Sequence, residues 1–134
     1  MRTHFNPKNN PRVIIIQKLY SKFFNDENVL DFPKHRFKKF IKDTVNGTIE
    51  RNDLILDELN TKLGDDFVFE NLDKVFQTIL KAATYEFMYK PQLSLNIIIK
   101  EYLNSSNFFL ENSQTKYLNA ILDNVGKKLR SKDG

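Results

Sequence analysis

The sequence of 134 residues contains no cysteine and no tryptophan, and it has only four glycines and two histidines. Without cysteine, neither a disulfide framework nor a thiolate nucleophile or metal site can form. Four glycines are too few for a glycine-rich loop that cradles phosphates. The histidines, His4 and His35, lie in a polar terminus and between two cations, which does not favour a general base or a metal ligand. We therefore expect no catalytic site, no cofactor and no metal, so the chain is predicted not to be an enzyme.

The sequence also lacks any apolar run near the roughly 20 residues that a membrane-spanning helix needs. Its longest runs, Val13–Ile16 and Ile97–Ile99, have lengths typical of the buried face of a helix. No apolar stretch typical of a secretory signal follows the charges at the N-terminus. We expect a cytoplasmic protein with no membrane partner.

The charges that are present are distributed unevenly. Residues 1–42 hold ten lysines and arginines against three acidic residues, residues 43–73 hold two against nine, and residues 74–134 hold nine against five. This pattern indicates either faces with different partners or salt bridges between segments of one fold, and the sequence leaves both readings open. The acidic stretch 43–73 could likewise face a basic protein or only solvent.

Apolar residues recur at helical spacing through most of the chain, whereas strand signals are weak. The pattern predicts an all-α fold of about six or seven helices. We expect a single domain, residues 1–134, with mobile ends at residues 1–9 and 128–134.

Local sequence signals predict where these helices begin and end. Asn10 followed by Pro11 is typical of an N-cap and the first helical residue, and this helix should end near Asn25. The other predicted boundaries, in chain order, are a start at Asp31–Pro33, an interruption at Asn46–Gly47, an end at Gly64, an end at Lys90–Pro91, a cap at Ser94 and a cap at Asn112 or Ser113.

Cations lie close to suitable helix positions or aromatic rings at two places in the chain. Nucleic-acid binding needs cations that neutralise phosphates and flat side chains that stack on unpaired bases. Lys8 and Arg12 lie near the start of the first helix, where the helix dipole also favours anions. Lys116 precedes Tyr117 in the last helix, although the residues alone favour Tyr117 as a core aromatic with its hydroxyl at the surface.

Several segments of the chain resemble the NusB family of transcription antitermination factors. Segment 72–87, which reads Leu-Asp-Lys-Val and ends in Ile-Leu-Lys-Ala-Ala-Thr-Tyr-Glu-Phe, is similar to a family signature with the same order of residue types. The match continues through 94–101 and into 116–123, where Lys-Tyr-Leu-Asn-Ala-Ile-Leu-Asp resembles a second family motif. Upstream, Arg12 to Tyr20 resembles the first helix of the family, so the resemblance covers nearly the whole chain.

The resemblance implies both a fold and a set of partners. Members of the family have two small helical bundles packed across each other. They bind the boxA element of single-stranded leader RNA in ribosomal RNA operons as a heterodimer with NusE, which is also a small-subunit ribosomal protein. That pair joins RNA polymerase in an antitermination complex, so the resemblance implies these three partners.

Carried over residue by residue, the resemblance assigns five RNA-binding positions and three positions that are structural or lie towards NusE. The RNA-binding positions are Lys8, Arg12, Lys81, Lys116 and Tyr117. The other three are Tyr20, Tyr85 and Glu86.

The chain departs from the family pattern most clearly at its N-terminus, where Asn9, Asn10 and Pro11 stand where arginines or alanine are usual. Lysine also replaces arginine at several sites, which keeps the charge but loses the planar fork of the guanidinium. We therefore expect weaker RNA binding by the chain alone and greater dependence on NusE. One alternative is an adaptor of the same fold that binds protein but little RNA. Another, the RNA-recognition domain of an RNA-modifying enzyme, is disfavoured because the sequence leaves no room for a cofactor-binding domain.

Overall fold

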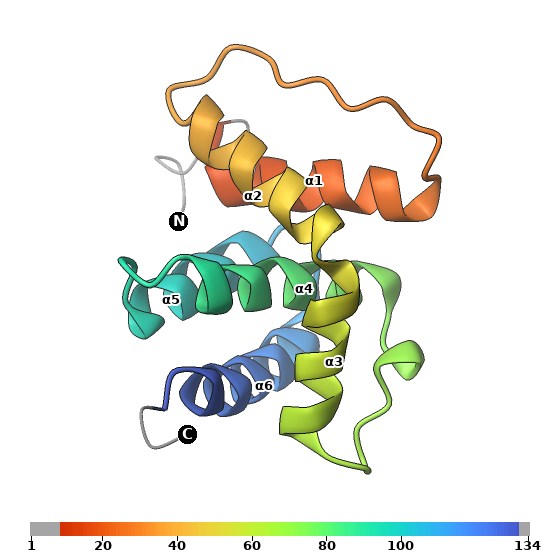
Figure 1. Cartoon of the computed structure of the whole chain (residues 1–134), viewed down its shortest axis with the longest axis vertical. Coiled ribbons are helices and arrows are strands. Elements are labelled where there is room, and N and C mark those ends of the chain that lie inside the picture. The colour runs from red at the N-terminus through yellow and green to blue at the C-terminus, as the bar shows by residue number, and fades with distance from the viewer. Residues whose placement is uncertain (1–8, 132–134) are drawn as a thin grey trace.

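Six α-helices and a short 3-10 helix, without any strand, form residues 9–131, the part of the chain that the computed structural model describes (Figure 1). The predicted all-α fold is thus confirmed. The elements are α1 (Pro11–Phe24), α2 (Lys38–Glu50), α3 (Asn52–Leu63), η2 (Phe69–Asn71), α4 (Lys74–Tyr89), α5 (Leu95–Ser106) and α6 (Asn112–Leu129). None of these helices is long and apolar enough to cross a membrane.

Helix α4 lies at the centre of the molecule and packs against all five other α-helices. Helices α1 and α2 cover one side of it, while α5 and α6 pack against it from the other side (Figure 1). Because neighbours surround it, every residue from Phe76 to Phe87 is buried, including polar ones. Any charged side chain in that stretch must therefore find its partner inside the protein.

Helix α1 begins where the sequence predicts. The side chain of Asn10 accepts hydrogen bonds from the backbone N–H groups of Arg12 and Val13, at 2.9 and 3.1 Å. Pro11, which has no N–H to satisfy, occupies the first helical position. The predicted cap at Ser94 is confirmed as well, because its hydroxyl accepts from the N–H of Ile97 at 3.1 Å.

Two other predicted boundaries are wrong. The second helix begins at Lys38 and not at Asp31–Pro33, since residues 28–35 have no regular structure and proline disfavours a helical residue before it. Gly47 does not interrupt that helix but lies inside it. The ring of Tyr85 packs so closely against Gly47 that it occupies the space a Cβ atom would need. The break between α2 and α3 comes at Arg51.

The N-cap of helix α6 lies one residue before the predicted positions. This N-cap is Glu111, which forms a capping box with Gln114, so Asn112 is the first helical residue. At the other end the helix continues to Leu129. The guanidinium of Arg130 donates to four backbone carbonyls at and just beyond the C-terminal end of α4, those of Glu86, Phe87, Lys90 and Leu93, at 2.6–3.3 Å. Arg130 thus joins the end of α6 to the end of α4.

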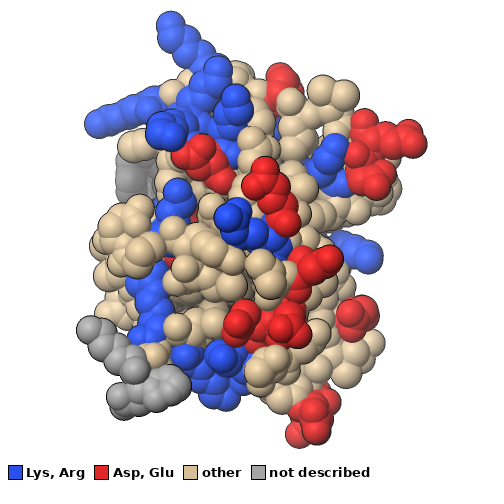
Figure 2. Space-filling model, in the orientation of Figure 1, with Lys and Arg blue, Asp and Glu red and all other residues tan. Residues whose placement is uncertain are grey.

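Charged side chains of opposite sign gather over different elements. Figure 2 shows lysines and arginines over the end of the connector that precedes α2 and over the first turns of α2, and acidic side chains over α3. The acidic residues Asp53 and Asp57 on α3 are exposed to solvent. The acidic stretch 43–73 therefore presents part of its charge at the surface, where either solvent or a basic partner could meet it.

Candidate nucleic-acid interface

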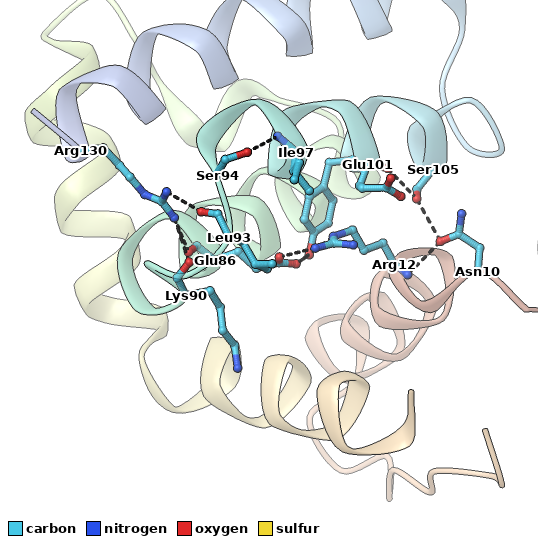
Figure 3. Close-up of polar contacts among 11 residues, drawn as sticks. Asn10, Arg12, Glu86, Lys90, Leu93, Ser94, Ile97, Glu101, Ser105 and Arg130 are labelled. Atoms are coloured by element: carbon cyan, nitrogen blue, oxygen red, sulfur yellow. Dashed lines mark hydrogen bonds and ion pairs between the residues drawn. The ribbon is translucent and has the colours of Figure 1, made fainter. Parts of the chain in front are cut away.

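Arg12, the arginine assigned to RNA, points into the protein (Figure 3). Its Nη2 and Nε atoms donate to the two carboxylate oxygens of Glu86, at 2.7 and 3.2 Å. The guanidinium also lies 5.0 Å from the ring centre of Phe40 and 5.4 Å from that of Tyr102. Arg12 is only 7% exposed, so these contacts show a structural ion pair between α1 and α4. Its RNA contact stays a prediction.

Glu86 is the centre of this buried network. It has no exposed surface, and its Oε2 atom also accepts the hydroxyl of Tyr102 at 2.5 Å. Burial, and then the negative charge of Glu86, raises the pKa of Tyr102 well above its ordinary value, so the hydroxyl keeps its proton and donates. On the far side of Arg12, the hydroxyl of Ser105 donates to the side chain of Asn10 at 3.3 Å. The network thus joins α1, α4 and α5.

The three positions that the resemblance gives as structural or NusE-facing differ in exposure. Glu86 is fully buried and Tyr85 is 7% exposed, whereas Tyr20 is 37% exposed. Burial raises the pKa of Tyr85, whose ring lies against Gly47 and 5.1 Å from the ring of Tyr89. Tyr20 stacks on Phe24, which is 77% exposed, with ring centres 6.1 Å apart. Of the three, Tyr20 alone offers substantial surface to a partner.

Lys81 lies in α4 under an aromatic cover. Its ammonium nitrogen is 4.0 Å from the ring centre of Phe23 and 5.5 Å from that of Phe69. Burial, and then the nearby charge of Lys74, lowers the pKa of Lys81. A hollow of about 400 Å³ adjoins it, and Tyr20 lines the same hollow. The structure thus brings together one position assigned to RNA and one assigned to NusE.

Lys116 and Tyr117 lie side by side on the first turns of α6, and both are exposed. Tyr117 is 50% exposed, and its ring centre lies 5.5 Å from that of buried Phe76 in α4. Within residues 9–131, Lys116 forms no ion pair. This pair therefore combines an unpaired cation with a flat ring held on one side, as base stacking requires.

The structure does not gather the five RNA-assigned residues on one surface. Lys8 lies outside the described residues. Arg12 and Lys81 are turned inward, and Lys116 and Tyr117 lie on α6.

A further group of cations, which sequence reasoning did not single out, occupies residues 34–42. Lys34, Arg36, Lys38, Lys39 and Lys42 are all exposed, and no acidic residue interrupts the segment. The sequence pointed to this group only through the excess of cations in residues 1–42. That excess does not tell which of the cations face solvent. Among residues 9–131, no group of three or more histidines and acidic residues is placed to hold a metal.

Comparison with known protein families gives a match along most of the chain. A sequence model of the NusB family matches residues 9–127. One similar protein is the transcription antitermination protein NusB of Sphingopyxis alaskensis, which is 29% identical over 69% of this chain and 62% of the relative. The transcription antitermination protein NusB of Novosphingobium aromaticivorans is 32% identical over 68% of this chain and 62% of the relative. The NusB of Sinorhizobium fredii is 27% identical over 93% of this chain and 89% of the relative. The match thus spans about three fifths of the length of the first two relatives.

A solved structure also has this arrangement of helices. T. maritima NusB superposes with a TM-score of 0.79 over 96% of each chain, at 20% sequence identity. At that identity the likeness shows the fold alone. It places the helices of this chain in a known all-α arrangement.

Proposed function

The chain belongs to the NusB family, and from this premise we propose that it is an antitermination factor that binds boxA leader RNA together with NusE. The complex would join RNA polymerase during transcription of ribosomal RNA operons. The chemistry required of this chain is binding: neutralised phosphates, stacked bases and a surface for the ribosomal protein.

The observation that carries the proposal is the exposed pair of Lys116 and Tyr117 on α6. Its position matches the lysine and aromatic residue of the family motif. Because Phe76 supports one side of the Tyr117 ring, the ring is held in place and can stack on an unpaired base at little entropic cost. The neighbouring ammonium of Lys116 can then contact a phosphate.

The NusE contact is assigned to Tyr20, together with its stacked neighbour Phe24. Exposed aromatic rings beside a hollow are typical of a protein interface, in which large flat side chains become the buried centre. Glu86 and Tyr85 support this surface indirectly, since they hold α4 in position from inside the protein.

The test is binding of boxA RNA and of a scrambled RNA to the chain, with and without NusE. We expect boxA to bind more tightly than the scrambled RNA, and the difference to grow when NusE is present. Tyr117→Ala should weaken boxA binding about tenfold, because one stacked base is worth about 1–3 kcal/mol. Tyr117→Phe, which keeps the ring on Phe76, should bind like the wild type, while Tyr117→Leu covers Phe76 and lacks the flat ring. Equal binding by the Leu and Phe variants would contradict a stacking role.

The adaptor alternative has one observation in its favour. Arg12 and Lys81 are turned inward, which removes two cations from the surface expected to meet RNA. An adaptor would bind NusE but show no measurable RNA binding at low salt, even with NusE present. RNA binding that weakens steeply with salt would exclude it.

A further inference from the structure

The connector before α2 and the first turns of that helix carry the densest group of exposed cations in the described part of the chain. Of the five cations in residues 34–42, only Lys39 is paired with a carboxylate within residues 9–131, that of Asp43 at 3.0 Å. The other four are Lys34, Arg36, Lys38 and Lys42. We call these four residues and Phe37 the α2 basic surface. Four exposed, unpaired cations in nine residues leave a local positive potential that the fold itself does not use.

Phe37 is the flat element of this surface. Its side chain is 45% exposed, and the Arg36 guanidinium lies 5.4 Å from its ring centre. Arg36 and Phe37 line two shallow hollows, one of about 610 Å³ with Lys34 and one of about 340 Å³ with Lys90. Phe37 therefore presents an exposed flat ring beside two hollows, which leaves the ring accessible to a stacking partner.

Backbone and side-chain contacts hold this surface next to the start of α1. The N–H of Phe37 donates to Nδ1 of His35 at 2.9 Å, so the ring proton lies on Nε2, which donates to the carbonyl of Asn9 at 3.1 Å. No side chain caps the first turn of α2, and it contains no acidic residue, so the helix dipole adds to the positive potential. The surface therefore lies beside Asn9, the residue that precedes the N-cap of α1.

We propose that the α2 basic surface binds single-stranded RNA flanking the element bound elsewhere on the protein, with Phe37 stacking on a base and Lys34, Arg36, Lys38 and Lys42 contacting phosphates. This inference rests on the proposed RNA-binding function. The combination of unpaired cations with an exposed ring between hollows fits an unpaired strand, because its bases can leave the stack and its phosphates follow a groove. Recognition here is by charge and stacking, which makes the contact independent of base sequence.

The experiment uses the full chain with NusE. The boxA RNA and the scrambled RNA are each tested without an extension, with eight uridines added at the 5′ end, and with eight uridines added at the 3′ end. A surface variant combines Lys34→Gln, Arg36→Gln, Lys38→Gln and Lys42→Gln. A matched control removes the same number of charges elsewhere, by Lys62→Gln, Lys100→Gln, Lys127→Gln and Lys128→Gln. Melting temperatures confirm that both fold.

We expect the uridine extension at one end to tighten binding by the wild type and the control about tenfold, and to tighten binding by the surface variant by less than twofold. The slope of log affinity against log salt for the extended RNA should become shallower in the surface variant by about 0.7 for each phosphate that it no longer neutralises. With Phe37→Leu, the uridine extension should tighten binding much less than in the wild type. With Phe37→Tyr, which keeps a flat ring, the extension should tighten binding as in the wild type.

An extension that leaves wild-type affinity unchanged, or that helps the surface variant as much as the control, overturns the proposal while boxA recognition stands. The proposed function is read separately, from the preference for boxA over the scrambled RNA without extensions. If that preference is absent while the extension still tightens binding through these four cations, the surface proposal holds and the boxA assignment fails.

Discussion

Two groups of cations, one buried around α4 and one exposed at the start of α2, differ in what their charges face. Arg12 is bonded to Glu86 and Lys81 lies under Phe23, whereas the cations of the α2 basic surface face solvent. The charge of Arg12 is used by the fold, because a charge removed from water must be met by a partner, whereas the charge of Lys81 has aromatic rings beside it and no carboxylate paired with it among the described residues. The exposed charges cost the fold little and remain available to a phosphate. Position within a basic stretch therefore says less about function than the direction of the side chain.

The largest expected effect comes from breaking the buried ion pair. Arg12→Ala should lower the free energy of unfolding by about 3–5 kcal/mol, because it leaves the Glu86 carboxylate buried without its partner. The measurement is urea denaturation at neutral pH. Lys38→Ala on the α2 basic surface is the matched exposed cation and should change stability by less than about 0.5 kcal/mol.

A neutral replacement of the whole network sharpens this prediction. The variant with Arg12→Met, Glu86→Leu and Tyr102→Phe removes every charge and leaves no donor without an acceptor among these three side chains. Its free energy of unfolding should be much closer to that of the wild type than the value for Arg12→Ala is, since apolar residues of similar size often replace buried ion pairs at small cost. A loss of less than about 1 kcal/mol in Arg12→Ala itself would mean that the pair contributes nothing to the fold.

A smaller effect is expected at Arg130, which belongs with the cations used by the fold although its charge is less buried. Arg130→Met should lower the free energy of unfolding by about 2 kcal/mol, because carbonyls at the end of α4 lose a charged donor. Lys128→Met is the control, since exposed Lys128 bonds to a single carbonyl, that of Lys62. Equal unfolding midpoints for the two variants would show that Arg130 does not hold the end of α6.

The smallest effect is expected at Lys81, where burial lowers the pKa below its value in the unfolded chain. The charged form is disfavoured in the folded protein, so Lys81→Met should raise the free energy of unfolding at pH 7, by less than the Arg12 and Arg130 variants lower it. As pH rises through the lowered pKa, the folded wild type loses this proton before the unfolded chain does and its penalty disappears. The advantage of Lys81→Met should therefore shrink between neutral pH and the pKa of the unfolded lysine. A growing advantage would contradict the direction of the pKa shift.

Much of the fold followed from the sequence, because caps and apolar spacing are local properties. Asn10, Pro11 and Ser94 act through neighbours a few residues away, and their roles were predicted correctly. Gly47 was misread as an interruption because its role depends on Tyr85, which is remote in sequence. The partner of Arg130 could not be predicted for the same reason.

The candidate interface was less predictable than the fold. Sequence alone placed Arg12 in a basic N-terminal region, but its partner Glu86 lies 74 residues away. Lys116 and Tyr117 were recognised as a cation beside an aromatic residue and also matched the family motif, whereas residues 34–42 appeared only as part of a regional excess of charge. Whether a cation faces solvent is decided by tertiary packing, which a charge count does not contain.

The most direct test of this account is the salt dependence of binding to extended boxA RNA by three proteins: the wild type, the surface variant and the neutral-core variant of Arg12, Glu86 and Tyr102. If exposed cations bind the phosphates, the neutral-core variant keeps the wild-type slope of log affinity against log salt, and the surface variant has a shallower one. A shallower slope in the neutral-core variant, with an unchanged slope in the surface variant, would show that Arg12 binds RNA and would contradict the account.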